Sequence, residues 1–141
     1  PYNTWGYHSG LTFGTNADPE DDPDGDGIQN RLEWIIGGNP LAQDAATLVT
    51  SSGDAATGLT LSFTRDESSI GTATLEVQWD TDLDGIWTDT VTVGPNSSSE
   101  ANGVEITVND TTDPDQITIN IPAINAPSDS LFARLRATAT P

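Results

Sequence analysis

The chain of 141 residues contains no cysteine, no methionine and no lysine, and it has a single histidine, His8. The absence of cysteine excludes disulfide bonds, thiolate catalysis and cysteine-based zinc sites. One histidine also excludes a zinc site built from three histidines. No apolar run is long enough to span a membrane, and no segment has the pattern of a signal peptide. The length fits one ordinary domain, or a small unit followed by a medium one.

Basic side chains are scarce. Four arginines face 22 acidic residues, and the net charge is -18. Such a chain repels nucleic acid and anionic membrane surfaces, so we expect no nucleic-acid partner and no membrane insertion. It would also repel a sulfated or carboxylated polymer unless calcium bridged the two. Disorder is the competing interpretation of an acidic chain, but the alternating strand patterns described below argue against it.

The most specific motif in the chain is a twelve-residue calcium loop at residues 22–33. Carboxylates hold positions 1, 3 and 5, and Gly27 at position 6 permits the sharp turn. A solvated acidic turn is the alternative, but every ligand position of the loop is matched. Calcium takes six to eight hard oxygen ligands. The sequence therefore predicts Ca²⁺ as the cofactor, with Asp22, Asp24, Asp26, the Ile28 carbonyl, Asn30 and Glu33 as its ligands.

A second acidic cluster repeats part of this spacing. Asp80, Asp82 and Asp84 stand at alternate positions, followed by Gly85. Position 12 of this run is Val91, which offers no carboxylate. The cluster is a second candidate metal site, and a hairpin loop held by Asx-turns is the favoured alternative.

Residues 1–45 are expected to form a calcium-loop subdomain with one short helix. The helical pattern runs from Arg31 to Ile36, and glycine and proline within residues 37–40 end it. Residues 14–23 are rich in helix-breaking residues. The unit is therefore expected to be half an EF-hand, with Trp34 packed against the aromatic start of the chain.

Residues 46–141 are expected to form an antiparallel β-sandwich of immunoglobulin or fibronectin type III character. Apolar and polar side chains alternate in short runs, which indicates strands with one buried face. Turn signals such as Asn102-Gly103 separate the runs. With a further short strand at Thr47–Thr50, about seven strands are expected. The predicted core residues are Leu61, Phe63, Leu75, Val77, Val91, Ile106, Ile119, Leu131 and Leu135.

The segment from Asp22 to Pro40 resembles the DPDGDG calcium loops of thrombospondin type 3 repeats and dockerins in bacterial secreted proteins. The runs Leu75–Trp87 and Phe132–Arg136 resemble the C-terminal β-domain that often follows such a loop. The resemblance covers nearly the whole chain. It implies an accessory module of a secreted hydrolase, lyase or adhesin. A dockerin has two loops in tandem and this chain has one, so cohesin binding is not expected.

The setting implied is extracellular or at the cell surface. A chain that starts at Pro1 and lacks methionine is expected to be a piece of a longer protein. A catalytic domain, such as that of a polysaccharide-degrading enzyme, is expected in the same parent chain, and the module itself is expected to be a monomer.

Catalysis by this chain is not expected. There is no nucleophile-elbow motif to accompany His8. Acidic residues that could pair for glycoside hydrolysis occur throughout, but a solvated acidic surface explains them better. Tyr2, Tyr7 and His8 are the residues that a lyase mechanism could use as acid and base.

Exposed aromatic side chains are the remaining functional candidates, because sugar rings stack on them. Trp79 shares its parity with Leu75 and Val77, which favours burial, but it stands at a strand end beside Asp80. Together with Tyr7 it is the predicted ligand platform, and a place in the core is the alternative for Trp79. The function expected is that of a non-catalytic, calcium-stabilised accessory module that binds a polysaccharide. The alternative is a structural, surface-anchoring or spacer module without a glycan ligand.

Overall fold

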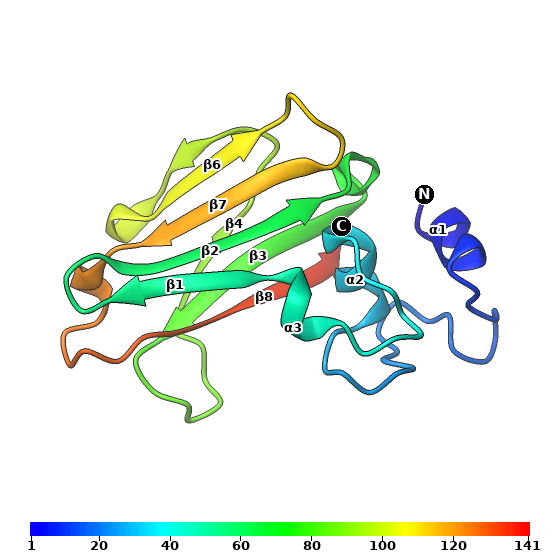
Figure 1. Cartoon of the computed structure of the whole chain (residues 1–141), viewed down its shortest axis with the longest axis horizontal. Helices are drawn as coiled ribbons and strands as arrows, with labels where there is room; N and C mark the ends of the chain where they lie inside the picture. The colour runs from blue at the N-terminus through cyan, green and yellow to red at the C-terminus, as the bar shows by residue number, and fades with distance from the viewer.

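A computed structural model describes all 141 residues and shows two antiparallel sheets (Figure 1). The larger sheet has the order β1-β2-β7-β6-β5, and the smaller one has the order β4-β3-β8. This confirms a mostly β chain with two antiparallel sheets. The strand bounds are β1 Thr50–Asp54, β2 Gly58–Arg65, β3 Ala73–Asp80, β4 Asp89–Thr92, β5 Ser98–Ser99, β6 Glu105–Asn109, β7 Asp115–Ile121 and β8 Phe132–Ala139.

The core lies between the two sheets and is filled by alternate residues of their strands. In β7, for example, Ile117, Ile119 and Ile121 are buried, while the residues between them are exposed or half-buried. Seven of the predicted core residues are buried as expected: Leu61, Phe63, Leu75, Val77, Val91, Ile106 and Ile119. The other two, Leu131 and Leu135, are only half-buried. They lie in or just before β8, which pairs with β3 on one side and has no strand on the other.

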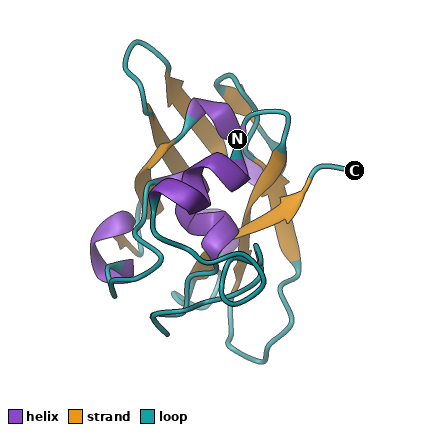
Figure 2. Cartoon of the chain, turned by 90° about the vertical axis from the view of Figure 1, so that its right-hand side faces the viewer, coloured by secondary structure: helices purple, strands orange, loops and turns teal.

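Three α-helices lie at one end of the sheets (Figure 2). They are α1 Tyr2–His8, α2 Asn30–Ile36 and α3 Ala45–Leu48. Gly37 ends α2 in the left-handed conformation with φ 85°, as the predicted glycine cap requires. No helix is both long and apolar enough to cross a membrane. Single 3₁₀ turns occur at Glu67–Ser69, Ala101–Gly103 and Ala123–Asn125.

Helix α2 joins the N-terminal region to the sheets. Trp34, Ile35 and Ile36 are buried and belong to the same apolar cluster as the inward residues of the strands. Tyr2 packs edge-on against Trp34, with 5.7 Å between ring centroids, and Trp5 packs on Tyr2. The predicted contact of Trp34 with the aromatic start is therefore confirmed. The predicted units 1–45 and 46–141 share one core.

Two predictions of local structure in the N-terminal half are wrong. Residues 1–45 were expected to hold one short helix, but α1 precedes the loop as well as α2. Gly6 within this helix hides its pattern, and Tyr2 and Trp5 pack against the core. The strand expected at Thr47–Thr50 is also wrong, because α3 extends to Leu48 and β1 begins only at Thr50. All residues of β1 are exposed and none is apolar, so alternation could not reveal it.

A buried ion pair ties β2 to β7. Arg65 and Asp115 stand directly opposite each other in the ladder, and both are almost fully buried. The Arg65 guanidinium donates to Asp115 Oδ2 through Nη2 at 2.6 Å and through Nε at 3.2 Å. Its Nη1 donates to the Gly94 carbonyl at 2.7 Å. The pair therefore also holds the segment in which the chain passes from one sheet to the other.

Candidate metal centre

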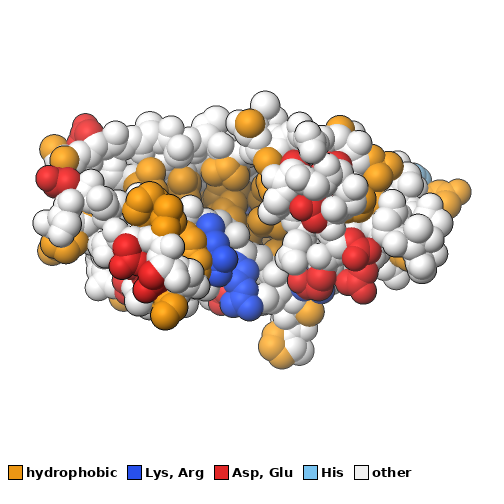
Figure 3. All heavy atoms as spheres, turned by 90° about the horizontal axis from the view of Figure 1, so that it is seen from below, with side chains coloured by type: hydrophobic (Ala, Val, Ile, Leu, Met, Phe, Trp, Pro, Cys, Tyr) orange, Lys and Arg blue, Asp and Glu red, His pale blue; other side chains and the backbone are white.

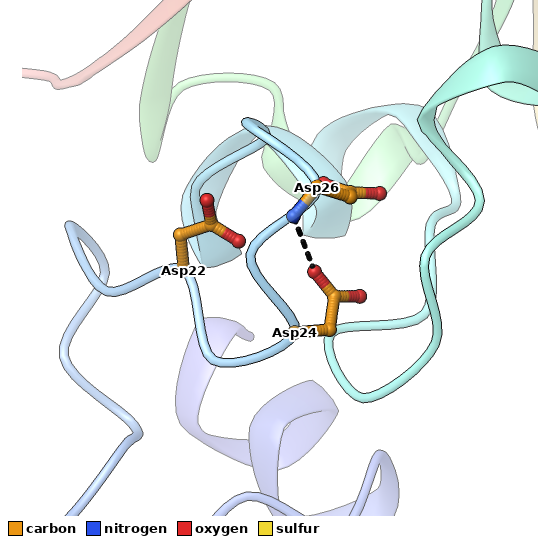
Figure 4. A group of neighbouring side chains, drawn as sticks. All are labelled: Asp22, Asp24 and Asp26. Atoms are coloured by element: carbon orange, nitrogen blue, oxygen red, sulfur yellow. Dashed lines mark hydrogen bonds between the residues drawn. The ribbon is translucent and has the colours of Figure 1, made fainter.

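The acidic loop is held in shape by hydrogen bonds between its own side chains and backbone. Asp22 Oδ1 and Oδ2 accept from the amides of Gly25 and Gly27, at 2.9 and 3.0 Å. Asp24 Oδ1 accepts from the Asp26 amide at 3.0 Å, as Figure 4 shows. These bonds turn the aspartates toward the inside of the loop. One ligand oxygen from each of the three carboxylates lies within 4.8 Å of the others.

Glu33 lies at the base of this loop, in the first turn of α2. The residue is 0% exposed, and both of its carboxylate oxygens are buried without a hydrogen-bond partner. A buried carboxylate in this state is costly unless a cation or a donor satisfies it. Glu33 forms a second group with Asp26 and Asp44, whose ligand oxygens all lie within 4.8 Å of one another. Asp26 belongs to both groups and joins them into one site.

Asp44 is the site residue that the sequence analysis missed. It precedes α3, eleven residues beyond Glu33 in the chain. Asp26 Oδ2 accepts from the amides of Asp44 and Ala45, at 3.0 and 2.9 Å, and so brings this segment onto the loop. Asp44 Oδ2 accepts from the Asn39 amide, while its Oδ1 is buried and unpartnered. A lone aspartate after the helix has no motif spacing, so no sequence signal marked it.

Asn30 anchors the loop to the preceding segment. It is 0% exposed, and its Nδ2 donates to the carbonyls of Asn16 and Asp18, each at 2.9 Å. Its Oδ1 is buried without a partner. The Tyr2 hydroxyl donates to the Ala17 carbonyl at 3.1 Å and fixes the same segment to α1. Asn30 therefore has one free buried oxygen, as a ligand at position 9 would.

The electrostatics of the site favour a cation. Burial raises the pKa of Glu33 to about 8, and the negative charges of Asp24, Asp26, Asp44 and Asp22 add to this shift. Desolvation, followed by the neighbouring Asp26 and Asp22, also raises the pKa of Asp24. Its Oδ2 is buried and unpartnered. A cation among these carboxylates would remove the repulsion and satisfy the unpartnered oxygens together.

Of the predicted metal ligands, the structure brings together Asp22, Asp24, Asp26 and Glu33, and adds Asp44. Asn30 contributes a buried, unpartnered oxygen. The Ile28 amide donates to Asp26 Oδ1 at 2.9 Å, which places this residue on the loop wall. Ligation by the Ile28 carbonyl stays a prediction.

The second acidic cluster does not form a comparable site. Asp80 Oδ1 accepts from the Thr81 amide, and Oδ2 accepts from both the amide and the hydroxyl of Thr88. These hydrogen bonds lower the pKa of Asp80. Asp82 and Asp84 are exposed and accept from backbone amides within the loop. The cluster is a loop held by Asx-turns, and its carboxylates are not gathered as those of the first loop are.

The predicted ligand platform is corrected at Trp79. This residue is 1% exposed and part of the core, so the prediction that it offers an open face is wrong. Its inward parity in β3 decides its position, and the strand end does not free it. Tyr7 is 72% exposed, and Phe13, 52% exposed, borders the same shallow depression together with Asn3 and Thr4.

His8 lies beside Tyr7 at the end of α1, with 5.6 Å between ring centroids. It is exposed and belongs to neither of the two groups of acidic side chains.

Comparison with protein-family models, curated proteins and solved structures found no match to this chain.

Proposed function

We propose that the chain is a non-catalytic module stabilised by one calcium ion. The observation that carries this proposal is Glu33, fully buried with both oxygens unpartnered among other carboxylates. All side-chain donors at the site are oxygens, which suit a hard cation better than zinc or copper. The site also offers more oxygens than the one or two carboxylates with which proteins usually hold magnesium. The residues that would hold the ion are Asp22, Asp24, Asp26, Asn30, Glu33 and Asp44.

The ion would act on the fold because of what the ligands are attached to. Glu33 is followed directly by Trp34, Ile35 and Ile36, which fill one end of the core. Asp44 leads into α3 and then β1. An ion that binds both residues would hold α2 in the core and hold the entry into the first strand against it.

A calorimetric titration with calcium tests this proposal. The chain is expected to bind one ion, with a dissociation constant on the order of 10⁻⁴ to 10⁻³ M, the range of extracellular modules. Glu33→Gln should remove most of this affinity. The matched control is Asp110→Asn, which removes one charge from an exposed residue between β6 and β7. Equal binding by wild type and Glu33→Gln would refute the assignment.

A second candidate function is the binding of a polysaccharide by a module of a secreted parent protein. The observation that favours it is the exposed pair Tyr7 and Phe13, with the polar side chains of Asn3 and Thr4 beside them. Aromatic faces open to solvent can stack on sugar rings. With a net charge of -18, a neutral or lightly charged glycan fits better than a sulfated one.

Affinity electrophoresis against neutral and acidic polysaccharides tests this second function. A neutral glycan is expected to retard the chain, and Tyr7→Ala with Phe13→Ala should abolish the retardation. Leu83→Ala is the matched control, because Leu83 is 69% exposed but aliphatic and lies in the loop after β3. If no polysaccharide retards the wild type, with or without calcium, the spacer or anchoring function replaces glycan binding.

A further inference from the structure

A hollow of about 420 Å³ lies between helix α1 and the segment of residues 13–21 that leads into the calcium loop. Tyr2 and Asn3 of α1 and Phe13 of the segment contribute to its lining. Asn3 and Phe13 also border the shallow depression beside Tyr7. On the face seen in Figure 3, acidic side chains gather toward the right, where the helices lie, and apolar side chains lie at the right-hand tip. The segment is therefore next to both the depression and the calcium loop.

Hydrogen bonds from the start of α2 hold this segment in place. Asn30 Nδ2 donates to the carbonyls of Asn16 and Asp18, each at 2.9 Å. Backbone amides at the start of α2 donate to the carbonyls of Asp21 and Pro19, at 2.8 and 3.0 Å. The second pair of bonds involves backbone alone, whereas the first pair depends on the side chain of Asn30.

Asn16 links this contact to the turn that carries Phe13. Asn16 Oδ1 accepts from the Thr12 amide at 2.7 Å. The Thr12 carbonyl accepts from the amides of Thr15 and Asn16, at 3.0 and 3.1 Å. These bonds close residues 12–16 into a turn that contains Phe13. Because Phe13 is 52% exposed, its position is set largely by this turn.

The other polar atom of the Asn30 amide is left for the calcium site. Asn30 stands at position 9 of the loop, and its Oδ1 is buried and unpartnered. An ion bound by this oxygen would fix the planar amide group and with it both Nδ2 donors. Without an ion, the buried and unpartnered oxygens of Glu33 favour local opening of the loop. Opening of the loop would displace Asn30 and release Asn16.

We propose that calcium binding orders the depression beside Tyr7, because Asn30 and Asn16 couple the ion to the turn that carries Phe13. The inference rests on the proposed calcium binding. Asn30 does not line the depression, so it acts as a positioning residue. A neutral polysaccharide that stacks on Phe13 would bind more tightly in the presence of calcium. By thermodynamic linkage, the bound glycan would raise the affinity for calcium by the same factor.

Amide hydrogen exchange of the full chain tests the coupling without a glycan, in a chelator and in calcium at a hundredfold excess over its dissociation constant. Calcium is expected to slow exchange at Thr15 and Asn16 by up to about 100-fold, the limit reached if the turn opens only after the ion leaves. Calorimetry on the same sample shows whether calcium binds. Calcium binding that leaves exchange in residues 12–16 unchanged would overturn the coupling alone. Absence of calcium binding would refute the proposed function, and this inference with it.

The decoupling variant is Asn30→Asp, which keeps an oxygen for the ion and removes both Nδ2 donors. It should still bind calcium, and calcium should still slow exchange in residues 25–27 of the loop but no longer at Thr15 and Asn16. The matched control is Gln29→Glu, which adds the same charge at an exposed neighbouring position and should keep the wild-type response. The melting temperatures show that both variants are folded. A wild-type response of Thr15 and Asn16 in Asn30→Asp would show that Asn30 does not carry the coupling.

Discussion

At the scale of single residues, the carboxylate of Glu33 is buried with no hydrogen-bond partner within the protein, which destabilises the fold in the absence of a cation. Glu33 faces the acidic residues around it, and no amide, hydroxyl or arginine reaches its oxygens. Asp22 and Asp26 accept from backbone amides through both carboxylate oxygens, whereas Asp24 does so through one oxygen and its other oxygen is buried without a partner. Glu33 and Asp44 are therefore the residues whose behaviour should respond most strongly to calcium.

The raised pKa of Glu33 leads to a pH-dependent stability. Between the ordinary value of 4.5 and about 8, the folded, calcium-free protein holds a proton at Glu33 that the unfolded chain releases. The free energy of unfolding contributed by this residue is therefore fully present below pH 4.5 and is lost as the pH rises through about 8. Urea unfolding in calcium-depleted buffer, from about pH 5 to about pH 8, measures this loss in the free energy of unfolding.

Calcium should reverse this trend, because the ion binds the ionised carboxylate and its affinity therefore rises over the same pH range. Glu33→Gln should flatten the dependence in calcium-depleted buffer. A variant that keeps the wild-type slope would show that another group titrates.

Asp44 should contribute to calcium affinity although it lies outside the twelve-residue loop. Asp44→Asn keeps the size of the side chain and an oxygen, but it removes the charge. We expect calcium affinity to fall at least tenfold, which corresponds to about 1.4 kcal/mol. Calorimetry on this variant and on Asp110→Asn separates the loss of a ligand from the loss of a distant charge. Equal affinities for the two variants would show that the ion is held by the loop alone.

At the scale of elements, alternation predicted the strands whose two faces differ in burial. β2, β3, β6 and β7 have one face in the core, and their runs were visible in the sequence. β1 was missed because it is polar throughout and fully exposed. The half-burial of Leu135 could not be predicted either, since it depends on which strand lies at a sheet edge. Strand order is a property of the whole fold, and periodicity within one strand does not encode it.

In the acidic site, too, residues at a fixed spacing were predicted and a residue brought in by the fold was not. The spacing of the loop predicted Asp22, Asp24, Asp26 and Glu33, because these ligands lie at fixed positions within one short segment. Asp44 comes to the site through hydrogen bonds from its backbone to Asp26, which only the folded chain reveals. Trp79 was assigned to the surface from its place at a strand end, but its inward direction buries it.

The ion pair between β2 and β7 should be the most sensitive polar contact in the sheets. Asp115→Ala would leave the buried Arg65 guanidinium without its carboxylate, and such a loss costs about 3–5 kcal/mol. Chemical denaturation of this variant measures the change in free energy of unfolding. Asp110→Ala, at an exposed position in the connection between β6 and β7, should change the free energy of unfolding by less than about 0.5 kcal/mol. A small effect at Asp115 would mean that water replaces the lost partner.

At the scale of the whole molecule, the charge of -18 opposes compaction, and the acidic loop concentrates part of it at one end. Ligation neutralises charge locally, whereas salt screens it everywhere. The two effects can be told apart because only calcium binds the folded state at a defined site.

Calcium at a hundredfold excess over its dissociation constant should stabilise the fold by about 2.7 kcal/mol. The melting temperature should therefore rise with calcium and fall with a chelator, at constant ionic strength. Sodium chloride at matched ionic strength is the control and should give a smaller rise. Equal melting temperatures with calcium and with chelator would contradict a structural role for the ion.

The edge strands β1 of the larger sheet and β8 of the smaller sheet differ from each other, and this affects how copies of the molecule could aggregate. If two copies paired β8 with β8 antiparallel about Leu135, Arg134 of one would face Arg136 of the other, and like charges opposite each other are destabilising. Pairing of β8 with β1 of the next copy avoids this clash, but it is a head-to-tail contact. Such a contact grows into a filament unless the rotation between copies closes it into a ring. The short, polar β1 and the large net negative charge both oppose it, so filament growth is the form of aggregation that high salt would favour.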